Sequence, residues 1–418
     1  MPVRWQIAWT LALVTTINYI DRAALSFAAP VMLPELGLST TQYGLVASGF
    51  FWAYAIGQVV SGRLIDRYGT KRAYSAAVVV WNVASAAHAL TRGFVSLLGF
   101  RIVLGLGEAA NFPASVKAIS EWFPARERSL ATGVLLVGPG LGAIITPLLM
   151  TWLILTLGWR WAFFISGAIG IAWLFLWQRV YFPVESHPRI SAAEKQLILA
   201  ERGAGATDAD AALPPLRIMV RSRAVLGLML SRFSCDGAFY FFLTFLPLYF
   251  STQRGLNLAQ TALATLVPWV FADIGGLFGG WLGKRLVESG MSIGRARKTV
   301  IWIGAILVLP VTLGALVAES LVVAVGLISI ALFAIQMKSS NLLVMPADLF
   351  RTRDVATVWG LFGALGSAGA AIFQAYAGWL IDNVSWTPVF VMVSMMHLVS
   401  ALIVVLMIPR VEPMPAFR

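Results

Sequence analysis

Residues 299–318 read T-V-I-W-I-G-A-I-L-V-L-P-V-T-L-G-A-L-V-A, a stretch of twenty positions without one charged side chain. About 20 apolar residues in an α-helix match the hydrocarbon thickness of a bilayer, so this stretch predicts a transmembrane helix. Eleven further apolar runs occur, and the twelve together cover residues 6–30, 43–64, 73–91, 94–121, 130–156, 161–182, 223–251, 260–287, 299–318, 320–346, 355–381 and 387–409. Runs of this length are too long and too evenly apolar for the strands of a barrel. The sequence therefore predicts an all-α membrane protein with twelve transmembrane helices in two six-helix bundles.

The composition supports a membrane protein and excludes several classes of function. Of the 418 residues, 59% are hydrophobic and only 12% are charged, whereas ordinary soluble domains carry roughly 25% charged residues. Twelve spans would use about 240 residues, which leaves little room for a soluble catalytic or DNA-binding domain. A polytopic membrane enzyme would need a catalytic cluster near one membrane face, and no such cluster is evident. We therefore expect no enzyme activity, no metal site and no cofactor.

The net charge of +12 is explained by membrane topology. Lysines and arginines concentrate in the loops on one side, and only Arg92, Arg160 and Arg254 fall on the other. Because cytoplasmic loops carry the excess of positive charge, both termini are expected in the cytoplasm, and nucleic-acid binding is not expected. We expect a multi-pass protein of a bacterial inner membrane that acts as a monomer within the lipid bilayer.

A polar segment divides the chain into an N-terminal bundle (1–182), a cytoplasmic linker (183–222) and a C-terminal bundle (223–418). Ser191 followed by Glu194 forms the pattern of a capping box, which predicts a short linker helix ending near Arg202. Two six-helix halves joined by a linker are typical of transporters that rock one half against the other.

The loop between the second and third runs carries a specific pattern, G-R-L-I-D-R-Y-G-T-K-R, over residues 62–72. It resembles the signature loop of the major facilitator superfamily, and this resemblance implies that superfamily's fold. Asp66 at a helix end is positioned to pair with arginines and helix N-termini, which would form a latch that breaks when the carrier opens inward. The predicted cytoplasmic gate consists of Gly62, Asp66, Arg67, Gly69 and Arg72.

Charged residues within the apolar runs indicate a functional site, because each costs roughly 2.5–3.5 kcal/mol at the centre of a bilayer. The first run holds N-Y-I-D-R, which ends with Asp21 and Arg22. The fourth run holds Arg101 and Glu108, which are seven residues apart and therefore share one helix face. An arginine offers a planar, permanently charged fork that suits a carboxylate. These residues predict a site for an organic anion.

Several motifs together resemble the anion:cation symporter family over nearly the whole chain. They are N-Y-x-D-R at 18–22, Tyr54 within F-W-A-Y-A-I-G-Q, R-x-x-x-G-x-G-E-A-A-x-x-P from Arg101, and E-W-F-P-A-R-E-R-S at 121–129. Later segments around Asp273 and Asp348 are most similar to the hexuronate branch. The resemblance implies proton coupling by Asp21 and Glu108, and recognition of the substrate carboxylate by Arg22, Tyr54 and Arg101, with Tyr19 as a further candidate from the first motif.

The same residues suggest a mechanism driven by a proton gradient. Burial favours the neutral form of a carboxyl, whereas a nearby arginine favours its anion. Protonation of Asp21 or Glu108 would release an arginine for the incoming carboxylate, so that proton and anion travel together. We therefore expect symport of protons with an organic anion, most simply a hexuronate or a related sugar acid. Import of another carboxylate or a sulfonate, anion exchange, and proton-linked efflux of drugs or metabolites remain alternatives.

Weaker candidates lie in the second half of the chain. Tyr240 is positioned for packing against a sugar ring, Asp273 is a candidate for substrate binding or coupling, and Trp359 and Ser367 are expected to face the substrate. The roles of Arg232, Asp236 and Lys338 remain open, as a gate, a structural pair or a substrate contact.

Overall fold

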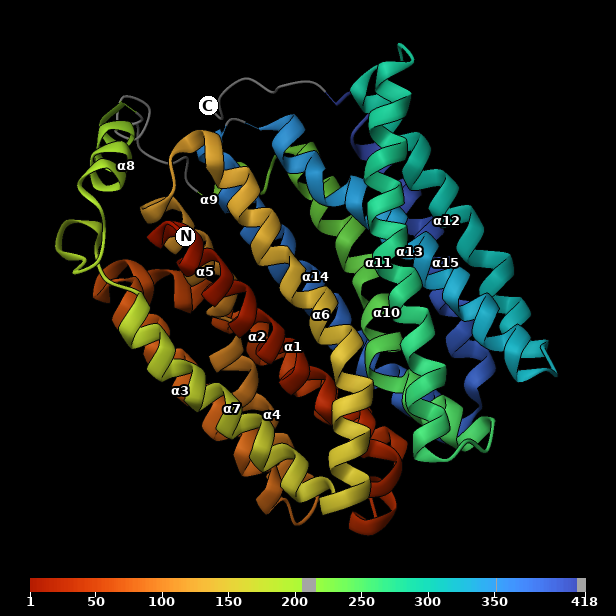
Figure 1. Ribbon diagram of the computed structural model, residues 1–418. Helices are drawn as coiled ribbons and strands as arrows, with labels where there is room; N and C mark the ends of the chain where they lie inside the picture. Colours follow the sequence, from red (N-terminus) through yellow and green to blue (C-terminus); the bar gives the residue numbers. More distant parts are fainter. Residues whose placement is uncertain (205–215, 351, 412–418) are drawn as a thin grey trace. The chain divides into compact units, whose positions relative to one another are not determined.

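The computed structural model describes residues 1–204, 216–350 and 352–411, and these residues form helices and their connections without any strand (Figure 1). The helices are α1 (Val3–Leu36), α2 (Thr40–Tyr68), α3 (Thr70–Ala87), α4 (Phe94–Glu108), α5 (Asn111–Trp122), α6 (Ala125–Leu157), α7 (Trp159–Val180), α8 (Ala192–Ala204), α9 (Leu216–Met219), α10 (Arg223–Gln253), α11 (Leu258–Glu288), α12 (Ile293–Val317), α13 (Leu321–Leu349), α14 (Thr352–Asn383) and α15 (Trp386–Met407). Two short 3-10 turns, η1 (His88–Leu90) and η2 (Val184–Ser186), complete the order. The predicted all-α membrane fold is confirmed.

Eleven helical segments among the described residues are long and apolar enough to cross a membrane. One of them joins α4 and α5, which are separated by a short turn after Glu108. α1 is not among the eleven, and it carries Asn18, Asp21 and Arg22 in its middle, which make it more polar than an ordinary span. Its 34 residues correspond to about 50 Å at 1.5 Å per residue, which exceeds the roughly 30 Å hydrocarbon core. α1 is therefore long enough to be the twelfth span.

By packing, the chain divides into two compact units. Unit 1 comprises Met1–Met32 and Trp52–Ala211, and unit 2 comprises Leu33–Phe51 and Ala212–Arg418. The start of α2 thus packs with unit 2, although α2 precedes the linker in sequence. The predicted bundle limits at residues 182 and 223 describe the order of spans along the chain and stay a prediction.

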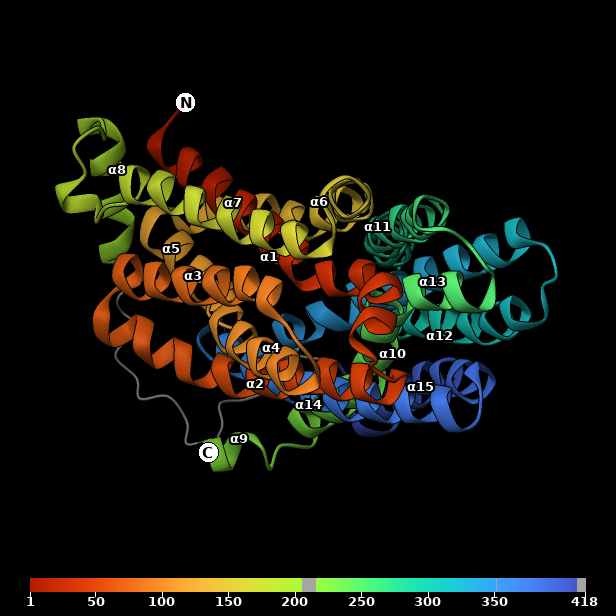
Figure 2. The same ribbon diagram turned by 90° about the horizontal axis from the view of Figure 1, so that it is seen from below.

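In unit 1, α3 runs alongside α4 and α7 (Figures 1 and 2). Glycines make this close packing possible. A Cβ at Gly107 of α4 would lie 2.8 Å from the Trp81 backbone nitrogen of α3, and a Cβ at Gly167 of α7 would lie 2.5 Å from the Asn82 carbonyl oxygen. Gly138 and Gly142 of α6 allow α6 to approach α1 equally closely. These contacts fix the rotation of α1, α3 and α4, and α1 and α4 carry the buried Asp21, Arg22, Arg101 and Glu108.

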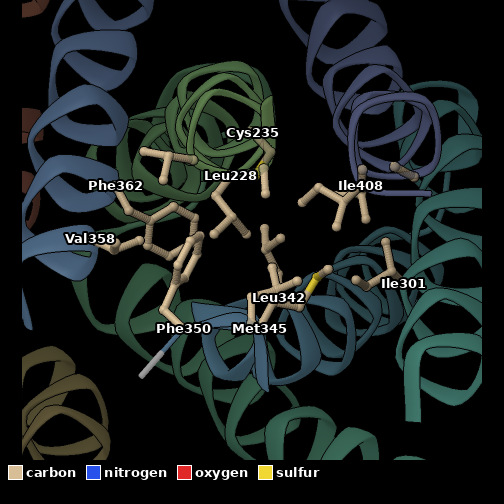
Figure 3. Close-up of a cluster of buried hydrophobic side chains, with 14 of the residues drawn as sticks. Leu228, Cys235, Ile301, Leu342, Met345, Phe350, Val358, Phe362 and Ile408 are labelled. Carbon is tan, nitrogen blue, oxygen red and sulfur yellow. The ribbon is translucent and has the colours of Figure 1, made fainter. Parts of the chain in front are cut away.

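In unit 2, α10 packs against α14 and α15, and α13 packs against α11 and α12. Gly275 and Gly279 of α11 approach the backbone of α13 closely, as the small residues around Asp273 led us to expect. Figure 3 shows a buried apolar core between α10, α12, α13, α14 and α15, which includes Cys235, Phe350 and Phe362. Cys235 is a buried free cysteine.

The N-terminus of α2 is capped within unit 2. The backbone N–H groups of Thr40 and Thr41 donate to the two carboxylate oxygens of Asp382 near the end of α14. Behind this cap, a Cβ at Gly44 would lie 2.5 Å from the Gln374 carbonyl oxygen. Tyr43 donates from its hydroxyl to the Thr244 carbonyl oxygen of α10 at 2.7 Å. The cap and these contacts hold the first turns of α2 on α10 and α14.

The linker begins as part of unit 1. The Ser191 hydroxyl accepts from the Glu194 N–H at 3.2 Å, as the capping box predicted, and α8 follows to Ala204. The Glu194 carboxylate, however, accepts from the N–H groups of Val3 and Arg4, each at 3.1 Å, so it caps α1 instead. The Arg4 guanidinium bridges Glu194 and Glu127 of α6 at 3.0 and 2.8 Å. The linker helix is thus tied to the start of α1.

Candidate functional site

A buried ion pair joins α1 to α4 in unit 1. The Arg22 Nε and Nη2 atoms donate to the Glu108 Oε2 atom at 2.9 and 2.8 Å, and the two side chains are 4% and 0% exposed. Asn18, one turn before Arg22, accepts from Arg22 Nη2 at 3.4 Å. Sequence analysis predicted both charged residues as functional, and the structure shows that they contact each other directly.

Aromatic rings surround the same guanidinium. The Arg22 Cζ atom lies 4.7 Å from the centre of the Tyr54 ring of α2 and 5.0 Å from that of Tyr19. Both distances are within the range of cation–π attraction. Tyr54 is buried, so the rings keep Arg22 charged in a dry environment without neutralising it. This arrangement brings together four of the predicted residues, namely Tyr19, Arg22, Tyr54 and Glu108.

Arg101 lies two turns before Glu108 on α4 and is 2% exposed. Its Nη1 atom donates to the Arg22 backbone carbonyl oxygen at 3.4 Å. α4 ends at Glu108, and the chain bends through Ala109 and Ala110 before α5 begins. Both arginines therefore lie beside the same stretch of α1.

Asp21 has different partners from Arg22, although the two residues are adjacent. Its Oδ1 atom accepts a hydrogen bond from the Ser85 hydroxyl of α3 at 2.7 Å, and Ser85 lies 3.2 Å from the Ser166 hydroxyl oxygen of α7. Successive residues of an α-helix point about 100° apart. α1 therefore directs Arg22 toward Glu108 and Tyr54, and Asp21 toward α3 and α7. Sequence analysis missed both serines.

The site holds two acids and two permanently charged bases, all buried. With Asp21 and Glu108 ionised, the charges of Asp21, Arg22, Arg101 and Glu108 sum to zero. A buried ion pair is stable only while it stays balanced, because an uncompensated charge in a dry interior is costly. Any added anion must therefore enter with a cation or displace one of the carboxylates. Neutralising one carboxylate by a proton would leave a guanidinium able to bind a carboxylate at two points.

The structure describes most of the predicted gate loop. Gly69 connects α2 to α3 with φ of 80°, a conformation that favours glycine. Arg67 and Arg72 are exposed, and the Arg67 guanidinium lies 5.4 Å from the centre of the Tyr68 ring. Gly62 lies within the last two turns of α2. The Asp66 side chain lies outside the described residues, so its pairing stays a prediction.

The four candidates from the second half of the chain lie in unit 2. Tyr240 packs against Phe51, with ring centres 4.4 Å apart. Trp359 donates to the Leu343 carbonyl oxygen at 3.2 Å, and Ser367 is buried. Asp273 is half-buried and makes no ion pair with the part of the chain that the structure describes. Their roles in substrate binding stay predictions.

The charged residues whose roles the sequence left open also lie in unit 2. Arg232 and Asp236 form an ion pair at 2.6 Å within α10. Lys338 is fully buried and donates to the Ser400 hydroxyl at 2.7 Å. Among the described residues, no three His, Cys, Asp or Glu side chains lie close enough together to hold a metal ion.

Comparisons with known proteins identify the family of the chain. Residues 11–337 match the Major Facilitator Superfamily. The chain is 33% identical over 411 residues to a hexuronate transporter of Escherichia coli (strain K12), covering 96% of this chain and 93% of the relative. It is 32% identical over 406 residues to a D-galactonate transporter of Escherichia coli O6:H1, covering 95% and 93%.

Among solved structures, a bacterial homologue of the human lysosomal transporter Spinster superposes with a TM-score of 0.74 at 18% identity, over 97% of this chain and 96% of that one. This similarity concerns the fold alone. The family match and the identity with curated transporters extend further, because they cover most of the sequence, including the N-Y-I-D-R and G-L-G-E-A-A motifs. The chain therefore belongs to the Major Facilitator Superfamily, and its resemblance to the anion:cation symporter branch is confirmed.

Proposed function

We propose that this protein is a proton-coupled importer of an organic anion, a hexuronate or a related sugar acid, that works by alternating access of two six-helix bundles. The observation that carries the proposal is the buried Arg22–Glu108 pair beside Arg101. The relatives described above support the substrate class, because they are named for hexuronate and D-galactonate. The proposed setting is a bacterial inner membrane with both termini in the cytoplasm, and the working unit is a monomer.

The mechanism follows from the charge balance of the site. In the substrate-free protein, Glu108 neutralises Arg22. A proton taken from outside neutralises a carboxyl, and one guanidinium then exchanges its protein partner for the carboxylate of the substrate. A monoanion that enters with one proton leaves the total charge unchanged, so the loaded site needs no new counter-ion. The proton gradient supplies the energy, and no cofactor takes part.

The arginines and tyrosines account for selectivity toward sugar acids. Arg101 and Arg22 provide fixed positive charges that favour anions and disfavour cations, which argues against efflux of cationic drugs. Tyr19 and Tyr54 present ring faces to the guanidinium. Such side chains combine apolar contact with hydrogen bonding, a combination suited to a sugar ring that carries several hydroxyls.

The proposal is tested by uptake into proteoliposomes containing the purified protein. Labelled galacturonate, glucuronate and galactonate are supplied outside, with and without an acid-outside pH gradient. We expect accumulation that requires the gradient and is competed by the other sugar acids. Anion exchange without coupling would instead give uptake that ignores the gradient but requires an internal anion, and that result would overturn the proposal.

Substitution of one arginine tests recognition. Arg101→Ala removes a charged donor, and a charge-assisted hydrogen bond contributes about 1.5–3 kcal/mol, so the affinity for galacturonate should fall about 10- to 100-fold. Arg92→Ala removes an exposed arginine near the start of α4 and serves as the matched control. A normal affinity in Arg101→Ala would exclude this arginine from the binding site.

A membrane-potential dye measures the number of protons carried with each anion. One proton per monoanion moves no net charge and leaves the dye signal unchanged, whereas two protons move one positive charge inward and change it.

A further inference from the structure

A row of hydroxyl groups leads from Asp21 to the backbone of α7. The Ser85 hydroxyl donates to Asp21 Oδ1 at 2.7 Å, and the Ser85 oxygen lies 3.2 Å from the Ser166 oxygen. Ser166 in turn donates to the Phe163 carbonyl oxygen at 3.1 Å. Asp21, Ser85 and Ser166 are all at least 98% buried. Asp21 thus has a bonding environment of its own, although Arg22 beside it is paired with Glu108.

This row can supply a hydrogen bond to the Asp21 Oδ1 atom in both protonation states of the carboxyl, whereas Oδ2 is buried without a hydrogen-bond partner among the described residues. A hydroxyl group carries one donor and accepts through its oxygen, and it rotates freely. When Asp21 is ionised, Ser85 donates to it, as the structure shows. When Asp21 is protonated, its own O–H can donate to Ser85, whose hydroxyl then turns to donate to Ser166. Ser166 continues to donate to Phe163, so each hydroxyl retains an acceptor.

We propose that Ser85 and Ser166 are positioning residues that allow Asp21 to take up and release a proton without moving its side chain. The inference rests on the proposed proton coupling and assigns to it two residues on α3 and α7. The incoming proton forms the O–H bond of the Asp21 carboxyl. No other covalent bond changes, and the two hydroxyl groups only rotate. Glu108 differs, because its partner is the guanidinium of Arg22 and not a hydroxyl group.

The other charged or titratable groups around Asp21 are the same in every variant tested. They are Arg101 and Glu108 on α4, Arg22 as the next residue of α1 and, beyond Arg101, the imidazole of His88 on η1. α7 contributes only the hydroxyl of Ser166 to this contact. Differences between serine variants therefore report on the hydroxyl row and not on a change of net charge.

The two serines are expected to act in opposite directions. Ser85→Ala removes the donor to the ionised carboxylate, and hydrogen bonds to charged groups are about twice as strong as neutral ones. The protonated form is then favoured, so the external pH of half-maximal uptake should rise by about one unit, a roughly tenfold change in proton affinity. The Ser166 hydroxyl donates to the Phe163 carbonyl oxygen, so Ser166→Ala mainly removes the acceptor that Ser85 needs when Asp21 is protonated. The half-maximal pH should then fall by about half a unit, a roughly threefold change.

The experiment measures gradient-driven uptake of labelled galacturonate into proteoliposomes over a range of external pH. A second measurement follows exchange of galacturonate between protein-containing vesicles loaded with it, which requires no net proton release. Ser85→Ala should retain exchange but show reduced net uptake at neutral internal pH, because its proton is released more slowly. Raising the internal pH by about one unit should restore its net uptake, which a purely structural defect would not allow.

Controls separate this inference from the proposed function. Ser85→Thr keeps the hydroxyl and should restore the wild-type pH profile, and Ser394→Ala removes a buried serine of α15 that donates only to its own helix. Failure of the wild-type protein to exchange or accumulate galacturonate would overturn the proposed function itself. Normal wild-type coupling with shifts of the same sign in both variants, or with none, would overturn the hydroxyl row alone. If Ser85→Ala fails to fold, the sign of the Ser166→Ala shift decides.

Discussion

Replacing Glu108 by glutamine changes the charge of the proposed site and preserves most of its shape. The carboxylate receives two hydrogen bonds from Arg22, at 2.8 and 2.9 Å, and is 0% exposed. Removing one partner of a buried ion pair leaves the other charge uncompensated, which costs about 3–5 kcal/mol. The purified variant should therefore unfold at a temperature several degrees lower than the wild type. An added sugar acid, whose carboxylate can pair with Arg22, should restore more stability to the variant than to the wild type.

The same substitution should separate binding from accumulation. In the wild type the substrate carboxylate competes with Glu108 for Arg22, whereas in Glu108→Gln this competition is absent. Galacturonate should therefore bind the variant more tightly, by about tenfold for each 1.4 kcal/mol of binding free energy gained. Exchange should persist, and gradient-driven accumulation should be lost. Fluorescence-detected unfolding with titrated galacturonate measures the first effect, and proteoliposome uptake measures the second.

A matched control is available on the surface. Glu288 forms an exposed pair with Lys284 at 3.6 Å, and such pairs contribute only about 0.3–0.5 kcal/mol. Glu288→Gln should leave stability, affinity and coupling unchanged. The reasoning would be refuted by a Glu108→Gln protein that still accumulates galacturonate on a pH gradient, or that binds it no more tightly than the wild type.

Three further predictions concern the scaffold around the site. Gly107→Ala places a Cβ 2.8 Å from Trp81, and this overpacking should lower the free energy of unfolding by about 1–3 kcal/mol. The control Gly99→Ala, on the same helix, meets nothing within 4 Å and should leave the unfolding temperature unchanged. Asp382→Ala removes the cap of α2 and should destabilise the protein by about 0.5–2 kcal/mol, with Asp382→Asn losing less; equal unfolding temperatures would contradict the cap. Burial lowers the pKa of His187 from its ordinary value of 6.5, so the folded protein favours the neutral imidazole. The contribution of His187 to the free energy of unfolding is therefore lost as the pH falls from 6.5 through the lowered pKa. Linker cleavage by a protease should accelerate over that range, and it should not do so in His187→Gln.

The sequence identified which residues form the site more accurately than it identified their partners. Asp21, Arg22, Arg101 and Glu108 are recognisable because a charge in a long apolar run needs a reason. Ser85 and Ser166 are not, because a serine in a transmembrane helix commonly bonds to the carbonyl of a preceding turn, as Ser26 does with Ala23. Only the rotation of α3 and α7 against α1 directs these hydroxyls toward a carboxylate.

The partner of Glu194 in the linker could not be predicted from sequence either, because it depends on how distant helices pack. The capping-box pattern correctly located the start of α8 at Ser191, which is a local property of four residues. The use of Glu194 depends on α1, which begins 191 residues earlier in the chain. A local pattern states that a carboxylate suits a helix N-terminus, but it does not state which helix receives it.

Asp21 and Arg22 have different partners because of the geometry of the helix that carries them. Adjacent residues of α1 point about 100° apart, so Asp21 and Arg22 bind different helices. Arg22 is paired by Glu108 and surrounded by rings, which suits exchange of one carboxylate for another. Asp21 is held by hydroxyls, which suit a group that gains and loses a proton. In the proposed mechanism the proton is taken up at Asp21 and the anion at Arg22, and the shared charge balance of the four buried groups favours binding of the two together.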